Sequence, residues 1–133
     1  MARRRIDGAK GMNALGRVAV FFDEHAHSNA SAADIPEQLR GDFLCAARFA
    51  LEEIGERHPG RSVEIRVPYA GAVQACEGVE HRRGTPPNVV ETDMVTFLRL
   101  VLGCIGWQEA CETGSVHASG TRSNLSKLFP LEL

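Results

Sequence analysis

Hydrophobic residues recur at helical spacing in the first half of the chain. The stretch from Met12 to Phe22 predicts a short amphipathic helix, and the next stretch, 23–33, lacks any period and predicts a loop. A longer helix is predicted from Asp34 to about Arg57, with Asp34 as N-cap and Glu37 at the capping-box position. Its apolar stripe comprises Phe43, Ala47, Ala50 and Ile54. Glycine costs about 1 kcal/mol relative to alanine inside a helix, so Gly41 is a candidate break.

The pattern changes to alternation in the middle of the chain. Val63, Ile65 and Val67 share one face of a half-buried strand. Turn residues follow, and 72–77 continues as a second strand, which predicts an antiparallel hairpin. We expect further short strands at 79–83, 88–92 and 115–119.

Helices return toward the C-terminus. Asp93 is the predicted cap of a helix that ends at Gly103, and a shorter helix covers 107–113. Ser123 is expected to cap a final helical turn that carries Leu125, Leu128 and Phe129. Strands grouped together, with helices before and after them, indicate the α+β class with helices against one face of the sheet.

Composition narrows the class of protein. The chain has 133 residues, 44% apolar and 24% charged, which suits one folded unit of ordinary globular type. We divide it into a basic arm, short helix and loop (1–33) and an α+β domain (34–133). The net charge of −2 gives no reason to expect nucleic acid, and the basic arm is interpreted as a solvated or locally paired tail.

Two further features bear on the compartment. No apolar stretch reaches the roughly 20 residues of a membrane helix, and the arginines at the start are not followed by a secretory pattern, so we expect a cytoplasmic protein without integral membrane insertion. The four cysteines lack paired spacing, which predicts buried, reduced thiols at Cys45, Cys76, Cys104 and Cys111.

One run of residues resembles a known family. Residues 81–93, His-Arg-Arg-Gly-Thr-Pro-Pro-Asn-Val-Val-Glu-Thr-Asp, together with Thr96 to Leu100, Trp107, Ala110 and Ala118 to Gly120, are similar to the bacterial sterol carrier protein orthologue family of actinobacteria. The segments 3–7 and 60–64 fit the same family. The likeness covers most of the chain.

The resemblance implies a mainly antiparallel, curved sheet of about five strands covered by helices, in some members with a hydrophobic tunnel between the layers. Related domains bind fatty acyl chains, sterols or other lipids. A similar fold is appended to mycothiol-dependent maleylpyruvate isomerases, whose helical catalytic domain is absent here. Function does not follow automatically from fold.

The candidate ligand residues follow from that layered fold. The pocket candidates are Val73, Phe97, Leu98, Val101 and Trp107, because a helix face and a strand face converge there in the family. Large apolar side chains also suit a plain core. Arg82 and Arg83 are the head-group candidates, since guanidinium groups recognise carboxylate or phosphate, although an internal salt bridge to Glu80 or Glu91 is the alternative.

Catalytic and metal chemistry has less support. Asp23, His25 and His27 form one compact set of ligand-type residues, but a metal needs a further ligand and a firmer support than an alanine- and serine-rich loop. His81, Glu91 and Asp93 include acid and base groups, yet Asp93 suits a helix cap and no nucleophile follows His81. We therefore predict no catalytic residues, no metal and no cofactor.

Three functions remain open. The first is non-enzymatic binding or transfer of a hydrophobic small molecule in a cavity between sheet and helices. The second is an accessory or interaction module with a filled core, which binds a partner or forms a homodimer through a strand edge. The third is a role in mycothiol metabolism beside a separate catalytic subunit. A pocket of several hundred cubic ångströms favours the first, and close packing around Trp107 favours the second.

Overall fold

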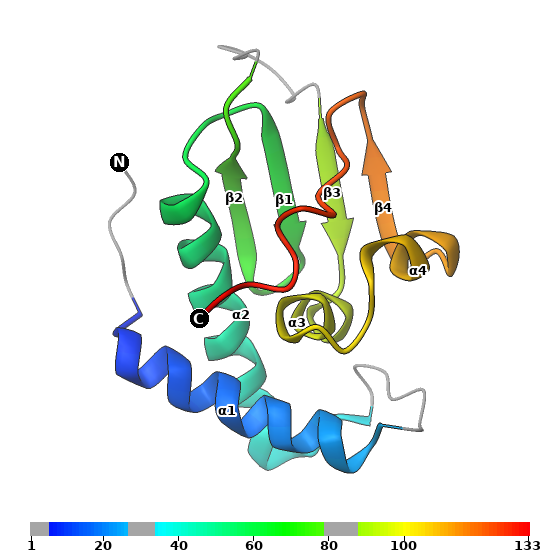
Figure 1. Ribbon diagram of the computed structural model, residues 1–133. Coiled ribbons are helices and arrows are strands. Elements are labelled where there is room, and N and C mark those ends of the chain that lie inside the picture. The colour runs from blue at the N-terminus through cyan, green and yellow to red at the C-terminus, as the bar shows by residue number, and fades with distance from the viewer. Residues whose placement is uncertain (1–5, 27–33, 79–87) are drawn as a thin grey trace.

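A four-stranded mixed sheet forms one layer of the protein. The computed structural model describes residues 6–26, 34–78 and 88–133. The strands are β1 (Val63–Val67), β2 (Gly71–Ala75), β3 (Val89–Thr92) and β4 (Val116–Ser119), in the order β2-β1-β3-β4 (Figure 1). Ile65 of β1 pairs with Val73 of β2 on one side and with Val90 of β3 on the other. The α+β class and the predicted hairpin are therefore confirmed.

The sheet differs from the expected one in number and direction of strands. The described residues contain four strands where about five were predicted, and the predicted strand at 79–83 lies outside them. The prediction of a mainly antiparallel sheet also needs correction, because the central strands β1 and β3 are parallel. The chain passes through β2 at the sheet edge before it returns to the far side of β1, so β3 runs in the direction of β1. β4 then pairs antiparallel with β3.

Helices cover one face of this sheet. They are α1 (Gly8–Glu24), α2 (Glu37–Arg57), α3 (Met94–Leu102) and α4 (Trp107–Glu112). In Figure 1, α2 runs alongside β2, α3 lies near the lower ends of β1 and β3, α4 lies at the β4 edge and α1 lies beyond the lower end of the strands. Val63, Ile65 and Val67 face these helices and are at most 1% exposed. Glu64 and Arg66 alternate with them on the opposite face, as the pattern predicts.

The first two helices have different boundaries from those predicted. Asp7 caps α1, since its carboxylate accepts from the Lys10 amide at 3.2 Å, and the helix includes Asp23 and Glu24, the first two residues of the predicted loop. The predicted Asp34 cap of α2 is wrong, because the helix begins at Glu37 with Pro36 as its N-cap. Gly41 does not interrupt α2, whose buried face continues through the following residues.

The core lies between the sheet and the helices and extends between α1 and α2. Gly11 is required at the α1–α2 contact, because a Cβ at this position would lie 2.3 Å from the ring of Phe49. The largest side chains that are fully buried come from helices, from β1 and from the chain beyond β4: Phe43, Ile54, Ile65, Phe97, Leu98, Leu100 and Leu125.

The chain beyond β4 crosses the helix-covered face of the sheet. We call residues 120–133 the C-terminal segment; it contains turns but neither helix nor strand. The predicted helix cap at Ser123 is wrong, because its hydroxyl donates to the Gly120 carbonyl at 2.9 Å and no helix begins there. In Figure 1 the segment passes in front of the strands and ends beside α2. Its apolar side chains therefore complete the core that α2 and α3 leave open.

Candidate ligand-binding site

Helix α3 supplies three of the five predicted pocket residues. Asp93 begins the helix as predicted, with one carboxylate oxygen accepting from the Thr96 amide at 2.8 Å. Gly103 ends it in the left-handed conformation at φ 78°. The three predicted pocket residues on this helix, Phe97, Leu98 and Val101, are buried and at most 1% exposed. In the structure as it stands, they are core side chains.

Trp107 joins this group through a residue that the sequence analysis did not select. Its ring stacks on that of Phe129, with centroids 6.1 Å apart and planes at 11°. Phe129 also contacts Phe97, whose ring meets it edge-on with the ring centroids 6.3 Å apart. Both separations lie within the range of favourable aromatic pairs. Phe129 of the C-terminal segment thus occupies the space between two predicted pocket residues.

Val73 lies elsewhere in the core. It is on β2 at one edge of the sheet, and its side chain packs on α2, where a Cβ at Gly55 would come within 2.9 Å of it. Trp107 belongs to α4, which lies at the β4 edge. The structure therefore brings Trp107 and Phe97 together and places Val73 at the opposite edge of the sheet.

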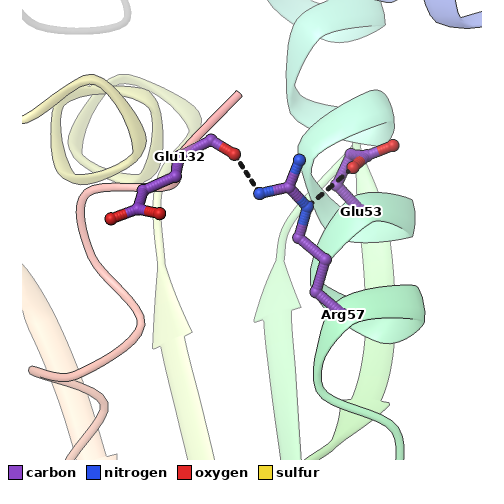
Figure 2. A network of polar contacts seen from close by, with 3 residues as sticks. All are labelled: Glu53, Arg57 and Glu132. Carbon is purple, nitrogen blue, oxygen red and sulfur yellow. Dashed lines mark hydrogen bonds and ion pairs between the residues drawn. The ribbon is translucent and has the colours of Figure 1, made fainter.

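Few interactions attach the C-terminal segment to the helices. The Leu131 amide donates to the Val101 carbonyl at 3.0 Å. Arg57, in the last turn of α2, donates from Nη1 to the Glu132 carbonyl and from Nε to the Glu53 carboxylate at 3.0 Å (Figure 2). The remaining attachment is apolar: Leu125 is buried, and Leu128, Phe129 and Leu131 are half-buried against the core.

A groove of about 380 Å³ runs between the end of α2 and the C-terminal segment. Its walls combine basic, acidic and apolar side chains: Arg57, His58, Lys127, Leu128, Pro130, Leu131 and Glu132. A second, more open hollow of about 410 Å³ lies on α1 and includes Met12, Val20 and Leu39. Neither contains Phe97, Leu98, Val101 or Trp107. Phe129, from the segment that forms one wall of the first groove, covers Phe97 and Trp107.

The predicted head-group residues Arg82 and Arg83 lie outside the described residues, as do His27 and His81. His25 ends α1, with Nδ1 2.9 Å from the Phe21 carbonyl oxygen and its ring stacked on Phe21. Within residues 6–26, 34–78 and 88–133, no three metal-ligand side chains gather. Glu91 is exposed on β3, in register with Arg66 and His117.

The cysteines carry free thiols, as predicted. Cys45, Cys76 and Cys111 are half-buried, and burial raises the pKa of the Cys76 and Cys111 thiols, which keeps them protonated at neutral pH. Cys104 is exposed, so the prediction of burial is wrong for this residue. It follows Gly103, which ends α3 and turns the chain outward.

The sequence profile of a family described as "Bacterial SCP ortholog" matches residues 39–131, well over half of the chain. The chain belongs to this bacterial sterol carrier protein family. The resemblance noted in the sequence is therefore confirmed, and the match contains the sheet, α3, α4 and almost all of the C-terminal segment. Helix α1 precedes the matched residues. A comparison with curated proteins found no significant match.

No helix in the described part of the chain has both the length and the apolar character needed to cross a membrane.

The site includes residues that sequence reasoning missed. Phe129 and Leu128 were expected in a helical turn, and nothing in their spacing indicates that Phe129 covers Trp107 or that Leu128 packs against the core. Arg57 is an ordinary basic residue at a helix C-terminus, where cations are favoured in any case. Its approach to Glu132 depends on a contact 75 residues away in the sequence.

Proposed function

We propose that this sterol-carrier-family protein binds a hydrophobic small molecule without catalysing a reaction on it. The site is the layer between sheet and helices beside Phe97 and Trp107. The observation that carries the proposal is that Phe129 covers this region. Phe129 belongs to the C-terminal segment, which has neither helix nor strand, and its ring contacts both Phe97 and Trp107. An apolar ligand can replace the Phe129 ring when the segment moves away.

Three properties of the C-terminal segment support this exchange. Apart from the buried Leu125, its apolar side chains Leu128, Phe129 and Leu131 are partly exposed already, so moving them uncovers less new surface than opening a fully buried core would. Its one backbone hydrogen bond to the helices within the described chain is that of Leu131. The adjoining groove of about 380 Å³, which residues of the segment line, has a volume typical of small-molecule sites.

Neutral 1-alkanols of increasing length test this function, because they vary apolar area without adding charge. Trp107 is the sole tryptophan, so its emission reports contact with the ligand at the proposed site. We expect the dissociation constant to fall about fourfold per added methylene until the site is full, since each buried methylene contributes about 0.8 kcal/mol. Unchanged emission and unchanged thermal stability with alkanols, fatty acids and sterols alike would overturn the proposal.

A second function has an observation of its own. Phe97, Leu98 and Val101 are at most 1% exposed, which suits an interaction module with a filled core. Strand β4 lies at the edge of the sheet, and His117, Ala118 and Ser119 on it are exposed, so it offers backbone groups for pairing with a second copy. Analytical ultracentrifugation distinguishes the two functions: concentration-dependent dimers together with no response to apolar ligands favour the module.

A further inference from the structure

Helix α1 exposes a row of apolar and small residues at one end of the molecule (Figure 1). Four large apolar residues are exposed in the described part of the chain, and two of them lie on this helix: Met12 is 42% exposed and Val20 is 58% exposed. Gly16 lies midway between them, and all three line the open hollow of about 410 Å³. We call Met12, Gly16 and Val20 the α1 row. Exposed apolar side chains gathered on one hollowed surface are typical of interaction sites.

Charged side chains flank the α1 row on one side. Lys10, Arg17 and Glu24 are all exposed and are seven residues apart, which is almost two helical turns, so they follow one line along the helix. Arg17 pairs with Asp42 at 2.9 Å. Lys10 and Glu24 form no ion pair with another residue in the described ranges, so their charges are not balanced there. The flank thus has a cation at one end and an anion at the other.

This surface is complementary to a second copy of itself. An antiparallel α1, related by a two-fold axis near Arg17, brings Met12 of one copy beside Val20 of the other. The same axis places Lys10 opposite Glu24 of the second copy, because each lies seven residues, or about 10.5 Å along the helix, from Arg17. Two equal apolar contacts and two equal ion pairs then form, as an isologous interface requires.

We infer that α1 is a homodimer interface, which pairs antiparallel with α1 of a second copy. A membrane surface is a poorer match, because helices that lie on membranes have a strongly basic polar face and α1 contains two basic and two acidic residues. A single pair of helices gives a small interface, so the dimer should be weak and should dissociate on dilution. The inference goes beyond the proposed function, since the α1 row lies apart from Trp107 and precedes the residues that match the family.

Sedimentation velocity of the full-length protein over a series of concentrations tests the inference. The buffer has low ionic strength, because salt screens exposed ion pairs. We expect an equilibrium between monomer and dimer. Val20→Lys places a charge in the α1 row of both copies and should raise the dissociation constant about a hundredfold. Because Val20 is exposed, the substitution leaves the core unchanged.

Tyr69→Asn is the matched control for loss of an exposed apolar side chain. Tyr69 is 91% exposed in the turn between β1 and β2, far from α1 in the fold. The variant should dimerise as the wild-type protein does.

Exchange of the two flanking charges tests the antiparallel orientation. Lys10→Glu or Glu24→Lys alone creates two like-charge pairs in the dimer, and each should raise the dissociation constant roughly tenfold. The double variant, Lys10→Glu together with Glu24→Lys, has the wild-type net charge and should recover the wild-type affinity. Residues 10 and 24 of one chain are about 21 Å apart along the helix, so they cannot pair within it.

Three results would overturn the inference. The first is a wild-type protein that stays monomeric at every concentration of the series. The second is an unchanged dissociation constant in Val20→Lys, since that dimer would form elsewhere, for example through strand β4. The third is a double variant that dimerises no better than the single variants. A wild-type monomer that binds neutral lipid vesicles, with the binding lost in Val20→Lys, would assign the α1 row to a membrane surface instead.

Discussion

Helix α1 and the C-terminal segment both pack on α2 and α3, but they are attached in different ways. Phe21 and Phe22 of α1 each meet Phe43 edge-on, with centroids 5.7 Å apart, and all three rings are buried. The C-terminal segment places the half-buried Phe129 on Trp107 and buries Leu125. Its hydrogen bonds to the helices, within the described residues, are the backbone bond of Leu131 and the bond from Arg57 to the Glu132 carbonyl. Regions with few buried contacts open at lower free energy than the core does. The comparison indicates that α1 is a fixed part of the fold and that the C-terminal segment can move.

The strongest test of the α1 side of this comparison is Phe43→Ala. Phe43 is fully buried between α1 and α2, so the substitution leaves a cavity and should lower the free energy of unfolding by about 3 to 5 kcal/mol. Urea unfolding measures the loss. A loss below 1 kcal/mol would mean that α1 is no more firmly packed than the C-terminal segment.

Gly11→Ala tests the close approach of α1 to α2. The added methyl meets the Phe49 ring and should cost about 1 to 3 kcal/mol through overpacking. Gly16→Ala is the matched control on the same helix, because nothing lies within 4 Å of its Cβ position. Relief of the glycine penalty should make Gly16→Ala neutral or up to about 1 kcal/mol stabilising. Equal effects of the two changes would contradict the described contact.

Phe129→Ala should lower stability less than Phe43→Ala does, and it should strengthen ligand binding. Removing a half-buried ring costs about 1 to 2 kcal/mol of unfolding free energy. The same substitution empties the proposed ligand position, so dodecanol should bind to the variant more tightly than it binds to the wild-type protein. Calorimetry measures both quantities. Weaker dodecanol binding in this variant would indicate that Phe129 supports the ligand and does not occupy its place.

Much of the fold could be predicted because local chemistry determines it. Asp93 and Gly103 specify the ends of α3, and alternation specifies β1. The parallel pairing of β1 with β3 depends on the path of the chain through β2, which leaves no local pattern. The start of α1 was missed because Gly8 and Gly11 weaken its pattern, although Gly11 is needed for packing.

The candidate site was less predictable than the fold. Phe97 and Trp107 could be chosen because they are large and apolar, and they do lie together. The order of strands puts Val73 at the other edge of the sheet, and that order is a property of the whole topology. The roles of Phe129 and Arg57 arise from contacts between distant segments, for which neither residue carries a sequence pattern.

Amide hydrogen exchange at Leu131 tests the central claim most directly, namely that a ligand binds where the C-terminal segment now lies. The Leu131 amide bonds the Val101 carbonyl at 3.0 Å, so it reports whether the segment is seated on α3. With dodecanol at a concentration that saturates the change in Trp107 emission, we expect faster exchange at Leu131 and unchanged exchange in α1. Unchanged or slower exchange at Leu131 under saturation would contradict the account, because the ligand would then bind without displacing the segment.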